Sequence, residues 1–219
     1  MRDMTSSTRQ GTLPSTGPSP LPSIQPGIRP DLPPAPGSEL HPSLDFANTL
    51  QRTPSGPIDR IGDRELATAW FLERELIPGG SALGDPCTAR LHELRAALRT
   101  LLGAVAEDAE PPRAALAAVN AALTAAPTAE PLDWDAAHGL HRTRLHPADQ
   151  ATDHLLALLA ADAAALLTGP DAEKLAGCGA TPCTRFLLRT HASRQWCSVR
   201  CGDRVRAARA YNRRTHAVD

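Results

Sequence analysis

Cys178-Gly-Ala-Thr-Pro-Cys183 and Cys197-Ser-Val-Arg-Cys201 are two cysteine pairs near the end of a chain of 219 residues. Thirteen residues separate the pairs, so four of the five cysteines fall within twenty-four residues. Two short-spaced pairs on either side of a hairpin-sized insert can surround one tetrahedral Zn²⁺, with zinc–sulfur distances of about 2.3 Å. The sequence therefore predicts a zinc site whose ligands are Cys178, Cys183, Cys197 and Cys201.

Other uses of these cysteines fit the spacing less well. Two disulfides would suit an exported protein, and a redox pair more often has two residues between its cysteines than the four and three found here. Because four cysteines leave no coordination position for water, we expect a structural zinc. His191 in the insert is an alternative ligand, although a surface histidine is the simpler interpretation. The metal would supply the stability that so small a core lacks.

The residues after Cys201 favour a helix with one basic face. Good helix formers predominate between Gly202 and Thr215. Arg206, Arg209 and Arg213 recur at a spacing that places them on one stripe of such a helix. Its positive N-terminal end would also face the thiolates and stabilise them.

Charge is distributed very unevenly along the chain. The net charge is −1, but residues 174–219 carry a formal charge of +8 and residues 1–173 a formal charge of −9. A basic segment of this kind indicates a polyanionic partner, for which DNA or RNA is the usual candidate. The alternative is that the arginines only keep the surface soluble.

Arg194-Gln-Trp-Cys-Ser-Val-Arg-Cys-Gly-Asp-Arg-Val-Arg-Ala-Ala-Arg-Ala-Tyr211 resembles the signature of the CGNR zinc-finger family. The tetrad that names the family corresponds to Cys201-Gly202-Asp203-Arg204, with Asp203 in place of Asn. The resemblance implies a treble-clef-like finger, in which a knuckle and a β-hairpin precede a helix that carries the second ligand pair. Together with the basic stripe it makes four arginines candidates for nucleic-acid contact: Arg204, Arg206, Arg209 and Arg213. Arg204 has a second interpretation, as a brace for the turn after Cys201.

Residues 1–38 are predicted to be a disordered, proline-rich tail. They contain nine of the 21 prolines and show no apolar periodicity, so they cannot offset the entropy cost of ordering. The tail lacks the apolar run of a secretory signal, and no segment is long and apolar enough for a membrane span. We therefore expect a cytoplasmic protein without a membrane partner, where cysteines stay reduced for metal.

Residues 39–172 are expected to form a mainly helical domain, followed by the finger at 173–219. The strongest helix signal starts at Asp85-Pro86, a cap followed by proline at the first helical position. Further helices are predicted from Asp63, over 113–123 and over 152–168, whereas 130–147 permits a short hairpin. The helix predicted from Asp85 rests on leucines that recur with a period of 3.6 residues: Leu91, Leu94, Leu98, Leu101 and Leu102.

Leu44-Asp-Phe-Ala-Asn-Thr-Leu50 resembles the opening of the ABATE domain, which precedes the CGNR finger in proteins of this architecture. The leucine-rich helix follows it in the expected order. The resemblance implies a stress-induced transcription regulator, a description that is itself an inference. A small molecule or a protein would be the effector of this domain. Asn48 and Arg52 are candidates to line a small-molecule pocket, unless Asn48 hydrogen-bonds locally and Arg52 is solvated.

Other chemistry-bearing residues give weaker signals. The spacing of His138, His141 and His146 does not make a convincing second metal site, and Cys87 is more simply an idle thiol. The sequence contains no phosphate-binding loop, nucleophile elbow or zinc-protease helix, so we expect a binding protein and not an enzyme. The favoured function is a zinc-binding transcription regulator that binds DNA through its finger helix. The alternative is a protein-interaction module whose zinc is purely structural.

Overall fold

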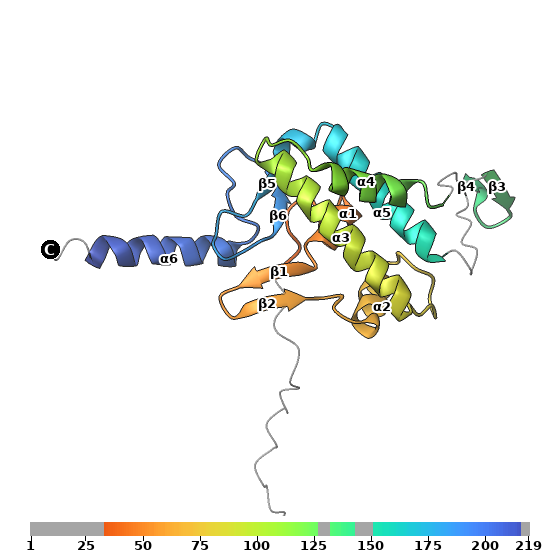
Figure 1. Ribbon diagram of the computed structural model, residues 1–219, viewed down its shortest axis with the longest axis horizontal. Helices are drawn as coiled ribbons and strands as arrows, with labels where there is room; N and C mark the ends of the chain where they lie inside the picture. Colours follow the sequence, from red (N-terminus) through yellow and green to blue (C-terminus); the bar gives the residue numbers. More distant parts are fainter. Residues whose placement is uncertain (1–32, 127–131, 143–150, 216–219) are drawn as a thin grey trace, which may run out of the picture. The chain divides into compact units, whose positions relative to one another are not determined.

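The computed structural model describes residues 33–126, 132–142 and 151–215. The described part contains six α-helices, one short 3₁₀-helix and three two-stranded antiparallel sheets, which confirms the mainly α fold (Figure 1). The helices are α1 (Pro42–Ala47), α2 (Arg64–Glu73), α3 (Asp85–Ala106), α4 (Arg113–Leu123), α5 (Ala151–Thr168), η1 (Ala172–Lys174) and α6 (Val199–Thr215).

The leucine period in the first half of the chain corresponds to α3, the longest described helix. It begins at Asp85, and Gly84 takes the N-cap position that the sequence had suggested for Asp85. The leucine stripe faces inward as its period predicts, with Leu91, Leu98 and Leu102 fully buried. Helix α3 is thus the element against which the others pack.

The strands form three separate hairpins or hairpin-like pairs. They are β1 (Leu50–Thr53) with β2 (Gly56–Asp59), β3 (Leu132–Asp135) with β4 (Gly139–Arg142), and β5 (Leu175–Gly177) with β6 (Phe186–Leu188). The β3–β4 pair confirms the hairpin expected within 130–147. The segment Pro54-Ser-Gly-Pro57 includes the turn between β1 and β2, and Gly56, with a positive φ of 111°, starts β2.

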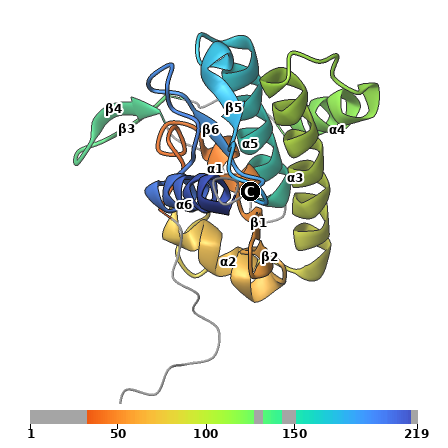
Figure 2. The ribbon, with the colours of Figure 1, turned by 90° about the vertical axis from the view of Figure 1, so that its left-hand side faces the viewer.

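The main core lies between α2, α3, α4 and α5. Figure 2 shows α3 and α5 side by side, with α4 beside them. Phe46 of α1 packs with Trp70 and Phe71 of α2, and the ring centroids of the latter two are 4.8 Å apart in an edge-to-face arrangement. These three aromatic side chains thus pack together within a core that is otherwise aliphatic and built mostly from leucine and alanine.

A partly buried ion pair, with Arg95 buried and Asp59 at the edge, fixes the β1–β2 hairpin against α3. The Arg95 guanidinium donates two hydrogen bonds to the Asp59 carboxylate, at 2.6 and 2.7 Å, and a third to the hydroxyl of Thr49. Burial raises the pKa of Asp59, but hydrogen bonds from Arg95 and from the Ile61 N–H outweigh it and hold that pKa below its usual value. Asp59 therefore stays charged next to Arg95 at neutral pH.

A second apolar cluster joins the helical region to the last part of the chain. Strand β5 packs on α3, and β6 lies against α1. The cluster draws its buried residues from both regions: Leu44, Ala47, Leu102, Leu166, Leu175 and Leu188. The described residues of both regions accordingly belong to one compact unit.

Asn48 forms a polar link at this junction. Its side-chain Nδ2 donates to the Phe186 carbonyl at 2.9 Å, and its Oδ1 accepts from the Phe186 N–H at 2.8 Å. The Asn48 amide thus pairs with β6 as another strand would. Asn48 was expected either to hydrogen-bond locally or to line a pocket, and neither expectation describes this contact with a residue 138 positions away. Arg52 is exposed, as one of the two alternatives expected.

Six residues of the expected tail, Pro33 to Ser38, are part of the fold. Ala35 is fully buried, and the Leu188 N–H donates to the Pro36 carbonyl at 2.8 Å. The rest of the expected tail, residues 1–32, lies outside the described residues. Among the helices that are described, none is long and apolar enough to cross a membrane.

We predict that Asn48→Ala lowers the free energy of unfolding by about 2 to 4 kcal/mol, because the buried N–H and C=O of Phe186 both lose their partner. Urea unfolding of the full chain measures this change. Asn120→Ala on the exposed face of α4 is the matched control and should change stability by less than about 0.5 kcal/mol. Equal effects of the two substitutions would contradict the role of Asn48 as a link.

Candidate metal centre

The first cysteine pair lies in a knuckle that directly follows β5. The Cys183 N–H donates to the Ala180 carbonyl at 2.8 Å and closes the turn. The Cys178 N–H donates to the carbonyl of Arg185, also at 2.8 Å, which extends the β5–β6 pairing up to the first sulfur. The short spacing and the strand pair together turn both sulfurs toward the same point.

The second pair is placed by the start of α6. Ser198 precedes the helix, and its hydroxyl accepts a hydrogen bond from the Cys201 N–H at 3.2 Å, as an N-cap residue does. Cys201 therefore lies in the first turn of α6 and Cys197 just before it. Gly202 suits the position next to Cys201, because a Cβ there would lie 3.0 Å from the Trp196 ring and the ring would have to shift.

The four sulfurs meet the geometric requirement of a tetrahedral metal site. Cys197 Sγ lies 3.8 Å from Cys183 Sγ and 3.7 Å from Cys201 Sγ, and all four sulfurs are within 4.8 Å of one another. A tetrahedron with metal–sulfur bonds of about 2.3 Å has edges of about 3.8 Å. The residues present thus fit a metal ion held by four thiolates, as the cysteine spacing predicts.

Burial and charge make the four sulfurs chemically unequal. Cys197 and Cys201 are buried, whereas Cys178 and Cys183 are partly exposed. The pKa of Cys183 is raised to about 12 by its hydrogen bond with Cys178, and that of Cys197 is raised by hydrogen bonds with Cys178 and Cys183. Cys178 accepts these hydrogen bonds, and its pKa is lowered. Without a cation, therefore, the four sulfurs do not all become thiolates at neutral pH.

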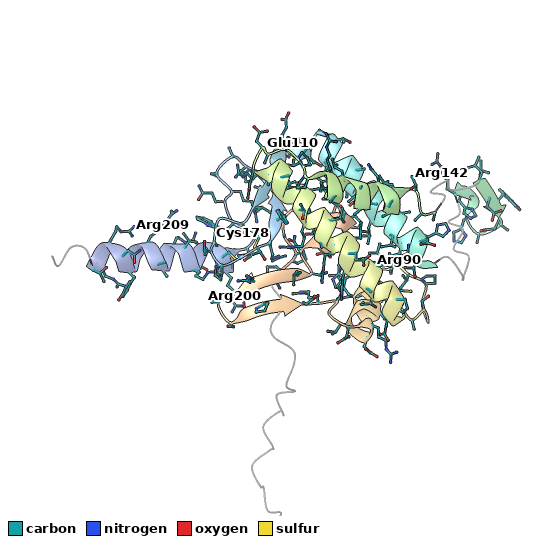
Figure 3. All side chains as sticks on the ribbon, in the orientation of Figure 1. Arg90, Glu110, Arg142, Cys178, Arg200 and Arg209 are labelled. Atoms are coloured by element: carbon teal, nitrogen blue, oxygen red, sulfur yellow. The ribbon has the colours of Figure 1, made fainter. Side chains whose placement is uncertain are left out.

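The candidate nucleic-acid residues of α6 separate into two groups. Arg209 and Arg213 are exposed on the outer part of the helix, whereas Cys178 lies at its base (Figure 3). Arg206 is exposed too, but it pairs with Asp203 at 2.6 Å and lies over the Trp196 ring.

Arg204 turns back toward the metal centre. Its Nη2 donates to the Ala180 carbonyl at 2.7 Å and lies 3.8 Å from Cys201 Sγ. Arg204 therefore acts as a brace, as the second interpretation expected, but it braces the first knuckle at Ala180 and not a turn after Cys201, which lies within α6. Arg185, which the sequence did not single out, also reaches the centre, with Nη1 3.8 Å from Cys197 Sγ. No local pattern could have indicated Arg185, because its role depends on the fold.

The weaker sequence candidates lie elsewhere. His138 and His141 both approach Asp135 on the β3–β4 hairpin, but among the described residues only the four cysteines form a cluster that could hold a metal. His146 lies outside the described residues, and His191 is exposed. Cys87 is half-buried and accepts a hydrogen bond from the Thr152 hydroxyl.

Two family models match the chain. The first, ABATE, is described as "Putative stress-induced transcription regulator" and covers residues 40–170. The chain belongs to the ABATE family. The second, the CGNR zinc finger, covers residues 174–214 and so includes all four cysteines of this ABATE protein. A search of curated proteins found no match to the sequence.

We predict that this ABATE protein binds one metal ion per chain, which elemental analysis of the purified full-length protein will count. Cys197→Ala should abolish the binding, because it removes the sulfur that lies closest to two of the others. Cys87→Ala is the matched control and should retain one equivalent, since Cys87 is not part of the cluster. Retention of a full equivalent by Cys197→Ala would contradict the site.

Metal binding should also release protons and weaken as the pH falls. Cys183 and Cys197, whose pKa values lie above neutrality in the metal-free protein, must each lose a proton to become ligands. The release of at least these two protons would make the apparent affinity fall by at least about a hundredfold for each pH unit below 7. Chelator competition at several pH values measures the slope. An affinity that does not change between pH 6 and 8 would contradict proton displacement.

Proposed function

We propose that the protein is a Zn²⁺-dependent transcription regulator that binds DNA through α6. The metal would be zinc because four thiolates in tetrahedral geometry suit this soft, redox-inert ion, and because the matched finger family is named for it. Zinc would supply no reaction here. It would hold the knuckle and the first turn of α6 together, with all four positions taken by Cys178, Cys183, Cys197 and Cys201.

The observation that carries the DNA proposal is the exposed, basic surface of α6. The helix contains six arginines and only one acidic residue, Asp203. Within α6 every residue from 207 to 215 except Ala210 is exposed. A helix that is polar on almost all sides gains little from packing against its own chain, so its surface is free for a partner. A helix of this size fits the major groove of B-DNA, where flanking arginines meet phosphates.

The exposed arginines would have different roles. Arg209 and Arg213 lie one turn apart on the same stripe, with no carboxylate partner among the described residues, and would contact phosphates directly. Arg206 would first have to exchange its pairing with Asp203. Arg204 is already engaged at the knuckle, so its predicted contact with DNA is the weakest of the four.

A second candidate function has an observation of its own. The finger shares a buried apolar cluster and the Asn48 link with the helical region, as a purely structural staple would. In that case the zinc would only stabilise the fold, and the arginines of α6 would bind an acidic protein surface. In either case the helical region would receive the effector, either a small molecule or a protein.

The five cysteines, all free of disulfides, suit a reducing compartment such as the cytoplasm.

The experiment that tests DNA binding compares the salt dependence of two double variants of the full chain. For Arg209→Ala with Arg213→Ala, the slope of log K against log salt should flatten by about 1.8, since each phosphate contact contributes about 0.9. The matched control is Arg90→Ala with Arg113→Ala, which removes two exposed arginines of α3 and α4 and should leave the slope unchanged.

Fluorescence anisotropy with duplex DNA of mixed sequence measures these slopes, and zinc content confirms that each variant is loaded. An equal change in both double variants would mean that only overall charge matters. Absence of DNA binding by the wild-type chain near 50 mM salt, with zinc bound, would overturn the DNA proposal and favour the protein-interaction module.

A further inference from the structure

Arg185 is a buried cation whose surroundings lack an anionic side chain other than cysteine. It is 4 % exposed, and among the described residues it forms no ion pair with a carboxylate. Its Nη1 lies 3.8 Å from Cys197 Sγ, its Nη2 donates to the Pro33 carbonyl at 2.9 Å, and its Nε has no partner. Burying an unpaired guanidinium costs several kcal/mol, so the sulfur cluster must supply the compensating charge.

Arg204 of α6 reaches the same cysteine cluster from the helix side of the finger. Its Nη2 lies 3.8 Å from Cys201 Sγ and donates to the Ala180 carbonyl, and its Nε is also buried without a partner. Arg185 belongs to the strand side of the finger and Arg204 to the helix side. The two guanidiniums therefore contact the two buried sulfurs of the cluster, one each.

The charges of this arrangement cancel. Four thiolates around one Zn²⁺ carry a net charge of −2, and the two guanidiniums carry +2. We propose that Arg185 and Arg204 are the charge-balancing partners of the metal centre, and that Arg185 extends this centre to the N-terminal strap, residues 33–37. This inference rests on the proposed zinc and adds residues that position its ligands.

The N-terminal strap completes the core of the finger from the other end of the chain. Ala35 is buried in one cluster with five finger residues: Ala176, Ala180, Leu187, Cys197 and Cys201. The Pro36 carbonyl accepts from the Leu188 N–H, so the strap also lies along β6. Gly37 has a φ of 91°, and a Cβ there would lie 2.4 Å from Leu188 Cγ. Only glycine allows this approach.

Arg185 makes the strap and the metal dependent on each other. One end of its guanidinium donates to the strap at Pro33, and the other end faces the ligand Cys197. A negatively charged metal centre favours the buried guanidinium, which in turn holds the strap. Because such coupling is reciprocal, loss of the strap must weaken metal binding by the same factor by which loss of metal weakens the strap.

Two substitutions of Arg185 in the full chain separate charge from packing. Arg185→Met retains most of the side-chain volume but removes the charge. Arg185→Lys retains the charge but removes the planar guanidinium with its paired N–H donors. We expect zinc affinity, measured by chelator competition, to fall about 10- to 100-fold for Arg185→Met, the range found for outer partners of metal ligands. Arg185→Lys should recover part of that loss. Arg189→Met, an exposed position just after β6, is the control and should bind zinc as the wild type does.

The same variants have a second readout that a packing role would not change. In the zinc-loaded protein, removal of a guanidinium leaves more negative charge on the sulfurs, so alkylation of the cysteines by iodoacetamide should accelerate in Arg185→Met and Arg204→Met. Arg185→Lys should react more slowly than Arg185→Met. The charge-balance inference fails if Arg185→Met binds zinc as tightly as Arg185→Lys, or more tightly, and alkylation is no faster than in the wild type. The guanidiniums would then only fill space.

The strap is tested by truncation and by a point variant. Deletion of residues 1–37 should lower zinc affinity at least tenfold. Adding Arg185→Met to the truncated chain should then cause a smaller further loss of zinc affinity than the same substitution causes in the full chain. Deletion of residues 1–31, which retains the strap, is the control. Gly37→Ala displaces the strap without shortening the chain and decides the question if the truncated protein does not fold.

The outcomes separate the two proposals. Absence of zinc from the wild-type protein would overturn the proposed metal, and this inference with it. Full zinc binding by the wild type together with unchanged affinity in Gly37→Ala and in the 1–37 deletion would overturn the strap alone.

Discussion

The packing of β5 and β6 against α1, α3 and α5 is the contact on which the rest of this structure depends. Leu175 and Leu188 of the strand pair are buried against Leu44 and Leu102 of the helices, so neither region covers its own apolar surface. Isolated β-pairs of three residues have little stability of their own. The helical region therefore holds in place the strands that carry the cysteine knuckle, and a metal bound to the four cysteines would hold them from the other side.

Polar contacts fix the position of the finger relative to the helical region at this apolar junction. Arg99 of α3 donates to the carbonyls of Ala47 and Leu50 and also to that of Thr184, next to the knuckle cysteine. It thus binds the end of α1, the start of β1 and the finger with one guanidinium. Apolar surfaces alone would permit a sliding contact, whereas hydrogen bonds to three defined carbonyls permit only one position.

The sequence allowed prediction of those features whose cause is local. The leucine period predicted α3, the cysteine spacing predicted which four sulfurs lie together, and the arginine spacing predicted the exposed basic face of α6. Each of these features depends on residues that are close in the sequence. The Asn48 link and the N-terminal strap were not predictable in this way, since their partners lie 138 or more positions away. Pro33–Ser38 has the composition of a tail, and only the burial of Ala35 against the finger gives it structure.

Arginine is used for opposite purposes in the two halves of the finger. In the base, Arg185 and Arg204 are turned inward to carbonyls and sulfurs, where a guanidinium is the one cation that can stay charged while weakly hydrated. On α6, Arg209 and Arg213 are turned outward. The formal charge of the segment therefore overstates the charge available to a partner, because the guanidiniums of Arg185 and Arg204 are engaged inside the finger.

The shared core also bears on how an effector of the helical region would reach α6. Helix α1 carries Leu44 at the junction and is followed directly by Asn48. Its Asp45 pairs with Arg74, the C-cap residue of α2. A change that moves α1 must therefore act on β6 and on the knuckle that β6 supports. Since packed cores shift between discrete arrangements and do not deform continuously, such a signal would reach the base of α6 as a change of position. A finger cut at residue 173 would lose this connection and expose Leu175 and Leu188, so its binding properties would not be those of the whole chain.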